Sequence, residues 1–173
     1  MILRVDVLKT AIDSAKDNKL TINEQKVILL SAHGQQFEQT IAKKFSKLKN
    51  LILICGHYEG FDERIKNFVD AEISVGDFVL TGGEIPAMLI ADSVARLVEG
   101  VLKKGSADSE SFSPYLEYPQ YTKPQVFEKR PVPKILLSGN HAEIKKWQED
   151  ESLKITQKLR PELIRKAPLP RKD

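Results

Sequence analysis

The sequence predicts an α/β fold built on a parallel sheet. Three short apolar runs, at residues 27–30, 51–54 and 78–80, each precede a polar turn that contains glycine. Unbroken runs of this length, rich in Val, Ile and Leu, are typical of parallel strands that are buried on both faces. Helical periodicity in the segments around them indicates right-handed crossovers between the strands.

Helices are predicted before and between these strands. Leu8, Ile12 and Ala15 predict a helix from Val5 to about Ala15. Apolar residues spaced by four, four and three predict an amphipathic helix between the first two strands, on Phe37, Ile41, Phe45 and Leu48. A second short helix is expected over residues 62–69.

The C-terminal half begins with a predicted helix over residues 86–102. One apolar stripe supports it, formed by Ile90, Val94, Leu97, Val98 and Val101. Pro86 fits near the first turn, where its missing N–H costs nothing. Residues 103–133 hold five prolines and no clear periodicity, which is typical of a functional or disordered loop. Asn140 and Glu143 resemble a capping box that opens another helix.

Composition narrows the class of protein. Hydrophobic residues make up 41% and charged residues 29% of the 173, close to globular averages, and no apolar run is long enough to cross a membrane. The N-terminus lacks the pattern of a signal peptide, so we expect a cytoplasmic protein. Cys55 has no partner for an internal disulfide, and one cysteine with three histidines gives no metal-ligand spacing. No metal site is therefore predicted.

The basic residues are concentrated near the C-terminus. Residues 1–122 carry 14 Lys and Arg against 17 Asp and Glu, whereas residues 123–173 carry 13 against 7. Such asymmetry is typical either of a segment that binds a polyanion or of a solvated surface.

The three glycine turns predict a ligand cleft. In an open parallel sheet, ligands bind at the carboxyl ends of the strands, and glycine allows the backbone to approach a ligand closely. Tyr58, Glu59, Asp77 and Glu84 lie near these turns. Neither the dinucleotide fingerprint GxGxxG nor the phosphate loop GxxxxGK[ST] is present, so the ligand is not expected to be held by phosphates. The histidines, His33, His57 and His141, are assigned no catalytic role because no carboxylate partner is evident.

Four long segments resemble the successive signatures of one family. They are residues 55–64 (CGHYEGFDER), 74–87 (SVGDFVLTGGEIPA), 118–124 (YPQYTKP) and 136–141 (LLSGNH), the last followed by Trp147. In this order they resemble the bacterial tRNA (guanine-N1)-methyltransferases of the SPOUT class, from Met1 to about Leu163. The resemblance implies a trefoil-knot fold and a homodimer with no membrane association. It also implies methyl transfer from S-adenosylmethionine to N1 of the guanine 3′ of the tRNA anticodon, position 37.

By the same resemblance, three knot loops would hold S-adenosylmethionine in a bent form, with its adenine in an apolar slot. These loops are residues 29–34, 56–60 and 75–83. The implied cofactor-binding residues are Leu29, Leu30, Ser31, Gly56, Tyr58, Glu59, Val75, Gly76, Asp77, Phe78, Val79, Leu80, Gly82, Gly83 and Pro86.

The resemblance also implies the catalytic residues. Removing the proton from guanine N1 requires a base, and the family base is an aspartate before Ser-Phe. Glu110 occupies that position here, and Asp108 is the alternative base. Arg96 matches a family arginine that helps to place the base or stabilise the guanine oxygen, although it could instead form an exposed pair with Asp92 worth about 0.3–0.5 kcal/mol.

The resemblance suggests three parts: a knotted S-adenosylmethionine-binding domain at 1–105, a flexible base loop at 106–133, and a partial helical tRNA-binding extension at 134–173. The basic residues expected to contact tRNA are Lys145, Lys146, Lys154, Lys158, Arg160, Arg165 and Lys166. Met1 aligns with the interior of the family sequence and the helical domain after Leu163 is short, so we expect a fragment or a shortened variant. The alternative function is a catalytically inert SPOUT module that binds S-adenosylmethionine or RNA.

Overall fold

The computed structural model describes residues 1–103, 105–106 and 110–166. The chain divides into two compact units, Met1–Lys103 and Lys104–Asp173. The elements of the first unit are α1 (Val5–Ala15), β1 (Gln25–Gln36), α2 (Gln39–Phe45), β2 (Asn50–Ile54), the 3₁₀ helix η1 (Glu63–Phe68), β3 (Ala71–Ser74) and α3 (Glu84–Ala95). Those of the second unit are β4 (Val126–Phe127), β5 (Arg130–Pro131), the 3₁₀ helix η3 (Lys134–Leu137), α4 (His141–Leu159) and α5 (Pro161–Lys166).

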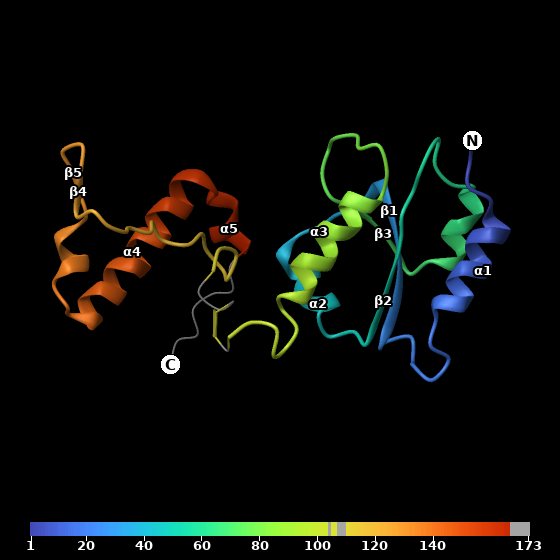
Figure 1. Cartoon of the computed structure of the whole chain (residues 1–173), viewed down its shortest axis with the longest axis horizontal. Coiled ribbons are helices and arrows are strands. Elements are labelled where there is room, and N and C mark those ends of the chain that lie inside the picture. The colour runs from blue at the N-terminus through green and yellow to red at the C-terminus, as the bar shows by residue number, and fades with distance from the viewer. Residues whose placement is uncertain (104, 107–109, 167–173) are drawn as a thin grey trace. The chain divides into compact units, whose positions relative to one another are not determined.

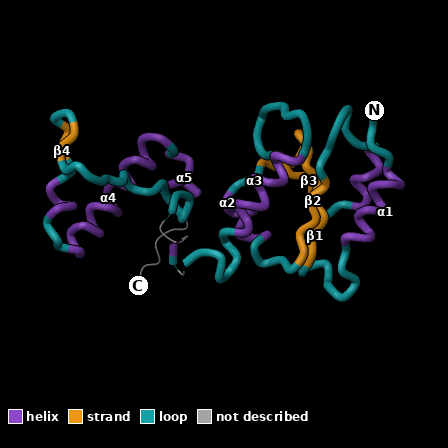
Figure 2. The backbone as a smooth tube through the Cα atoms, in the orientation of Figure 1, coloured by secondary structure: helices purple, strands orange, loops and turns teal. Residues whose placement is uncertain are grey.

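The first unit is a three-layer α/β structure (Figure 1, Figure 2). Its sheet has the order β2-β1-β3, and both pairings are parallel. The predicted parallel α/β fold and the helices at α1 and α2 are thereby confirmed. Among the described residues, no helix is long and apolar enough to span a bilayer.

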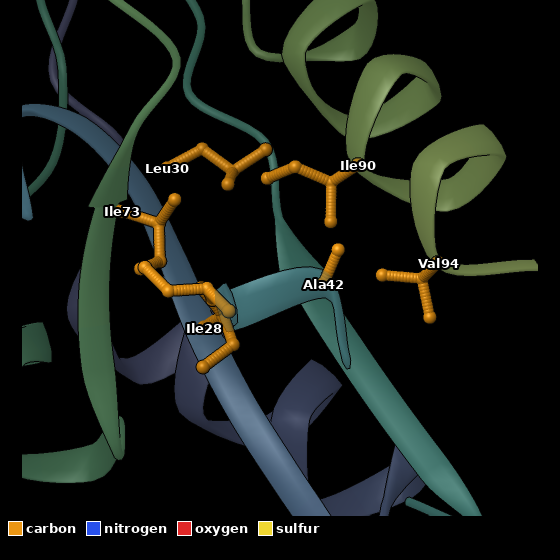
Figure 3. Close-up of a cluster of buried hydrophobic side chains, with 7 residues drawn as sticks. Ile28, Leu30, Ala42, Ile73, Ile90 and Val94 are labelled. Atoms are coloured by element: carbon orange, nitrogen blue, oxygen red, sulfur yellow. The ribbon is translucent and has the colours of Figure 1, made fainter. Parts of the chain in front are cut away.

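Strand β1 is central, and its residues 27–30 are buried on both faces. Its side chains alternate between two clusters: Val27 and Leu29 pack on the side of α1 and η1, whereas Ile28 and Leu30 pack on the side of α2 and α3. Figure 3 shows Ile90 of α3 pointing toward Leu30 and Val94 pointing toward Ala42 of α2, in the cluster that also holds Ile28. An unbroken apolar run is therefore needed here, because each face of the strand meets its own helical layer.

Strand β1 also continues past its predicted end. Leu30 and Gln35 both pair with Ile73, so the residues between them form an irregularity in the ladder. Gly34 lies directly on β3, where a Cβ would stand 2.4 Å from the Ile73 nitrogen. The predicted turn at 31–34 is thus an excursion within one strand rather than its end.

The third predicted strand is wrong. The strand is β3 at Ala71–Ser74, and the apolar run at 78–80 lies in a loop. The chain leaves β3 through a turn in which the Ser74 hydroxyl donates to the Gly76 carbonyl and accepts from the Gly76 N–H, each at 3.2 Å. This turn directs the apolar run away from the sheet, and Val79 is 97% exposed.

Helix α3 ends earlier than predicted. Ile90 and Val94 are buried as expected, but the helix stops at Ala95 with Arg96 as its C-cap. In the following turns each hydrogen bond spans three residues instead of four: the Leu97 N–H donates to the Val94 carbonyl, and the Val98 N–H donates to the Ala95 carbonyl. Gly100 then has a φ of +87°. Tightening of this kind is typical of the last turn of a helix, so the stripe beyond residue 95 does not reflect a continuous helix.

In the second unit, α4 begins where the capping signal predicts. The Asn140 side chain accepts a hydrogen bond from the Glu143 N–H at 3.3 Å. Residues 105–106 and 110–133 are mostly irregular, apart from the two-residue strands β4 and β5. Glu128 and Lys129, between these strands, both have positive φ, as expected for a tight two-residue hairpin turn.

Candidate functional site

A pocket of about 380 Å³ lies at the carboxyl ends of the strands in the first unit. Its walls come from all three predicted glycine turns. The lining residues are 29–33, 56–63, 65–66, 73–76, 78–83 and Pro86. Pockets of this size, with mostly apolar walls and a few polar groups, are typical of sites for small organic ligands.

The predicted cofactor-binding residues gather at this pocket. Every residue of the set lines it except Asp77, which lies in the turn beside it. The geometry therefore brings together residues that are up to 57 positions apart in the sequence, from Leu29 to Pro86. Their role in binding S-adenosylmethionine stays a prediction.

Two of the glycine turns are in direct backbone contact. The Gly83 N–H donates to the Gly56 carbonyl at 2.7 Å, and His57 and Gly82 form an isolated antiparallel bridge. A Cβ at Gly83 would stand 2.6 Å from both the Cys55 Cα and the Gly56 nitrogen. Only glycine allows this approach, which closes one wall of the pocket.

His57 has the carboxylate neighbour that the sequence did not reveal. Its Nδ1 lies 3.6 Å from the Glu84 Oε1, and both side chains are about half exposed. The expectation that His57 lacks a carboxylate in range is therefore wrong. Both residues stand in glycine motifs that had already been singled out, but only the contact between those turns brings them together. Glu84, together with burial, raises the pKa of the Cys55 thiol, burial being the larger cause.

A polar network beside the pocket also escaped prediction. The Ser31 hydroxyl donates to the Glu72 Oε2 at 2.9 Å, and the Lys66 Nζ lies 3.3 Å from Glu72 and 2.6 Å from Glu63. The hydrogen bond that the Lys66 ammonium donates to Glu63, reinforced by Glu72, raises the pKa of Lys66. No local motif signals this network, because Ser31 and Glu72 are 41 residues apart and meet only through the β1–β3 pairing.

The predicted catalytic residues lie in different units. Arg96 is the half-buried C-cap of α3, and its N–H donates to the Asp92 carbonyl at 3.2 Å. Glu110 is half-buried in the second unit, whereas Asp108 lies outside the described residues. Within the described part of the chain, no group of three or more His, Cys, Asp or Glu could hold a metal ion.

Comparison with known proteins places these features in one family. A family model described as tRNA (Guanine-1)-methyltransferase TrmD matches residues 1–166. A tRNA (guanine-N(1)-)-methyltransferase of Metamycoplasma arthritidis (strain 158L3-1) is 52% identical over 168 residues, 96% of this chain and 71% of the relative. An enzyme of the same name from Clostridium novyi (strain NT) is 51% identical over 94% of this chain and 68% of its own length. Another, from Caldanaerobacter subterraneus subsp. tengcongensis, is 54% identical over 85% of this chain and 62% of its own length.

Proposed function

The chain belongs to the tRNA (guanine-1)-methyltransferase family and is a methyltransferase, and from this premise we propose its donor, target and assembly. The proposed reaction transfers a methyl group from S-adenosylmethionine to N1 of the guanine 3′ of the tRNA anticodon, position 37. The comparisons give no support to a catalytically inert module. The cytoplasmic location and the trefoil knot of the SPOUT class stay predictions.

The convergence of three glycine turns on one pocket is the observation that carries the choice of donor. Leu29 and Leu30 supply buried lining at the pocket, and Phe78, Val79 and Leu80 supply an exposed apolar rim suited to adenine. The hydrogen bond from the Gly83 N–H to the Gly56 carbonyl holds two of these turns together at the pocket wall. No phosphate-binding motif is present, which suits a nucleoside without phosphates.

When bound, S-adenosylmethionine supplies an electrophilic methyl group on a sulfonium. No protein nucleophile is then required, and the chain's own task is to manage the guanine. Glu110 would accept the N1 proton, and Arg96 would stabilise the negative charge that develops toward the guanine oxygen. Positioned groups of these two kinds are sufficient for attack by N1 on the methyl carbon.

A homodimer is the proposed assembly. Helix α3 leaves one apolar face uncovered within its unit, with Ile85, Met88 and Leu89 exposed and Met88 at 71%. An apolar helix face left exposed in this way favours a protein partner, and a second copy is the family expectation. Sedimentation at micromolar concentration should give about twice 19.5 kDa; a monomer with full activity would contradict the dimer.

The second unit supplies the proposed tRNA contacts. Its exposed basic residues include Lys145, Lys146, Lys158 and Arg165, whereas Lys154 and Arg160 are paired with Glu151 and Glu162. Basic side chains bind the phosphate backbone without reading sequence, so this surface would dock the RNA and leave recognition of the guanine to the site.

The decisive experiment is methyl transfer to an unmodified tRNA transcript, with the position of the product mapped by primer extension. A stop at the guanine 3′ of the anticodon is expected, with no transfer when that guanine is replaced by adenine. Equal transfer to both transcripts would contradict the proposed target. Calorimetry with S-adenosylhomocysteine tests the donor site separately, since it needs no RNA.

A further inference from the structure

One face of α4 holds the segment that follows Glu110. Ser152, Thr156 and Arg160 are spaced by four, so they lie on the same side of the helix. Each contacts the segment 112–116 of the same unit: Ser152 and Thr156 bind the backbone of Leu116, and the Arg160 guanidinium lies 5.8 Å from the centre of the Phe112 ring.

The two hydroxyls bind the backbone N–H and the backbone carbonyl of Leu116. The Leu116 N–H donates to the Thr156 Oγ1 at 2.9 Å, and the Ser152 hydroxyl donates to the Leu116 carbonyl at 2.6 Å. The Thr156 hydroxyl in turn donates to the Ser152 carbonyl at 2.7 Å. Thr156 is fully buried, at 0% exposure. In such a place a lost partner leaves a peptide group unpaired, so the contact fixes Leu116 firmly to the helix.

The segment between Glu110 and Leu116 is closed by its own hydrogen bonds. The Phe112 N–H donates to the Tyr115 carbonyl at 2.7 Å, and the Glu117 N–H donates to the Ser111 hydroxyl at 3.1 Å. Phe112 has a φ of +70°, a conformation that a bulky residue adopts only where its surroundings hold it. Displacing Leu116 would therefore displace the backbone next to Glu110.

We propose that Thr156 and Ser152 are positioning residues for methyl transfer: through Leu116 they hold the loop at the place from which Glu110 takes the guanine N1 proton. The inference rests on the proposed function, because it requires Glu110 to be the base. Helix α4 also carries the exposed lysines proposed to dock tRNA. The same helix thus joins the RNA-binding surface to the residue that deprotonates the RNA.

The test is Thr156→Val, which keeps the side-chain volume but removes the acceptor for the Leu116 N–H. We expect kcat to fall about tenfold, because misplacing a reacting group by a fraction of an ångström slows transfer. Affinity for S-adenosylhomocysteine, measured by calorimetry, should stay unchanged. Raising the pH should recover part of the loss, since guanine N1 then loses its proton to solvent. Thr156→Ser keeps the hydroxyl and should restore the parental kcat and pH profile.

Controls separate positioning from stability. Thr10→Val is the matched control, because the Thr10 hydroxyl likewise donates to a carbonyl four residues earlier, that of Asp6, on the exposed side of α1. It should leave kcat unchanged. If Thr156→Val fails to fold, Ser152→Ala is the second variant, because it removes only the donor to the Leu116 carbonyl. It should lower kcat by less than tenfold, and higher pH should again recover part of the loss. Combining Thr156→Val with Glu110→Gln should add little to the loss from Glu110→Gln alone.

Two results would overturn the inference and leave the proposed function unaffected. The first result requires that the protein methylates tRNA and that Glu110→Gln inactivates it. If Thr156→Val then keeps the parental kcat, Thr156 has no positioning role, although the proposed function still holds. A loss that is independent of pH and additive with Glu110→Gln indicates a purely structural contact and also removes it. If the parental protein does not methylate tRNA, or if Glu110→Gln is silent, the proposed function or its base fails first and the inference fails with it.

Discussion

Glu24 joins the turn before β1 to the start of β2. Its carboxylate accepts from the Thr21 N–H and hydroxyl, each at 2.9 Å, and pairs with the Lys49 Nζ at 2.6 Å. The hydrogen bond from Lys49, with those from Thr21, lowers the pKa of Glu24 to about 2. The charged carboxylate is thus favoured in the folded state.

This depressed pKa predicts how acid destabilises the protein. Glu24 contributes to the free energy of unfolding in full at pH values above its ordinary pKa of 4.5. This contribution is lost as the pH falls toward about 2, because the Glu24 carboxylate binds a proton in the unfolded chain before it does so in the folded one. Glu24→Gln should therefore flatten the decline in the free energy of unfolding between pH 5 and about 2, measured by urea denaturation. Part of the decline in the free energy of unfolding should remain in this variant, because the pKa of Asp62 is also lowered to about 2, chiefly by Arg64. An unchanged acid limb in Glu24→Gln would contradict the assignment.

Glu110 carries the sharpest prediction about the reaction. Glu110→Gln keeps the size of the side chain but removes its ability to accept a proton, so methyl transfer should fall about a hundredfold or more. Affinity for S-adenosylhomocysteine should hardly change. Transfer assays on unmodified tRNA across a range of pH provide the measurement, and higher pH should partly restore the rate.

Asp108→Asn is the control for that assignment. It should leave transfer near the parental rate if Glu110 is the base. A loss in Asp108→Asn alone would mean that the family correspondence is displaced by two residues. Silence in both variants would place the base elsewhere in the chain.

At the scale of elements, the two adjacent glycines before α3 predict opposite outcomes for the same substitution. A Cβ at Gly83 would meet backbone atoms of Cys55 and Gly56 at 2.6 Å, which cannot move without opening the β2 turn. A Cβ at Gly82 would meet the Glu84 Oε2 at 2.2 Å and the His57 Nδ1 at 2.9 Å, both at the ends of half-exposed side chains.

We therefore expect Gly83→Ala to lower the melting temperature and to abolish S-adenosylhomocysteine binding. Gly82→Ala should fold normally, because Glu84 can rotate away, and should keep measurable binding. Thermal unfolding and calorimetry on the two variants provide the comparison. Equal melting temperatures for both would show that the backbone contact of Gly83 is not required.

The elements also show which sequence signals are reliable. The buried runs in β1 and β2 and the cap at Asn140 predicted their elements correctly, because burial on two faces and capping leave local patterns. The run at 78–80 did not predict its element correctly, because a short apolar run can line a pocket as well as form a strand. The four-residue β3 has too short a pattern to compete with it.

At the scale of the whole molecule, the position of the pocket could be predicted and its polar partners could not. The glycine turns after β2 and β3, with the excursion of β1 at 31–34, lie at one edge of the parallel sheet. The His57–Glu84 and Ser31–Glu72 contacts depend on how those turns cross, which neither spacing nor periodicity encodes. The roles proposed for Glu110 and Arg96 rest only on family resemblance, because loop acids and helix arginines are ordinary surface residues in any sequence.

The uneven distribution of charge predicts how the molecule binds RNA. Lys145→Gln with Lys146→Gln should weaken tRNA binding and lower the slope of log affinity against log salt by up to about 2, one counterion for each lost phosphate contact. Binding measured by filter retention at several salt concentrations provides the slope. Lys19→Gln with Lys47→Gln, two exposed lysines of the first unit, is the matched control and should leave the slope unchanged. Equal slopes in all three proteins would place the RNA elsewhere.

The exposed apolar rim at Phe78, Val79 and Leu80 has a thermodynamic consequence. Water in contact with apolar surface raises the heat capacity, and releasing that water lowers it. A donor that covers the rim should therefore bind with a negative change in heat capacity. Its binding enthalpy would become more exothermic at each higher temperature, and Val79, which is 97% exposed, would contribute to this change. A Val79→Ser variant should bind with a visibly shallower dependence of enthalpy on temperature.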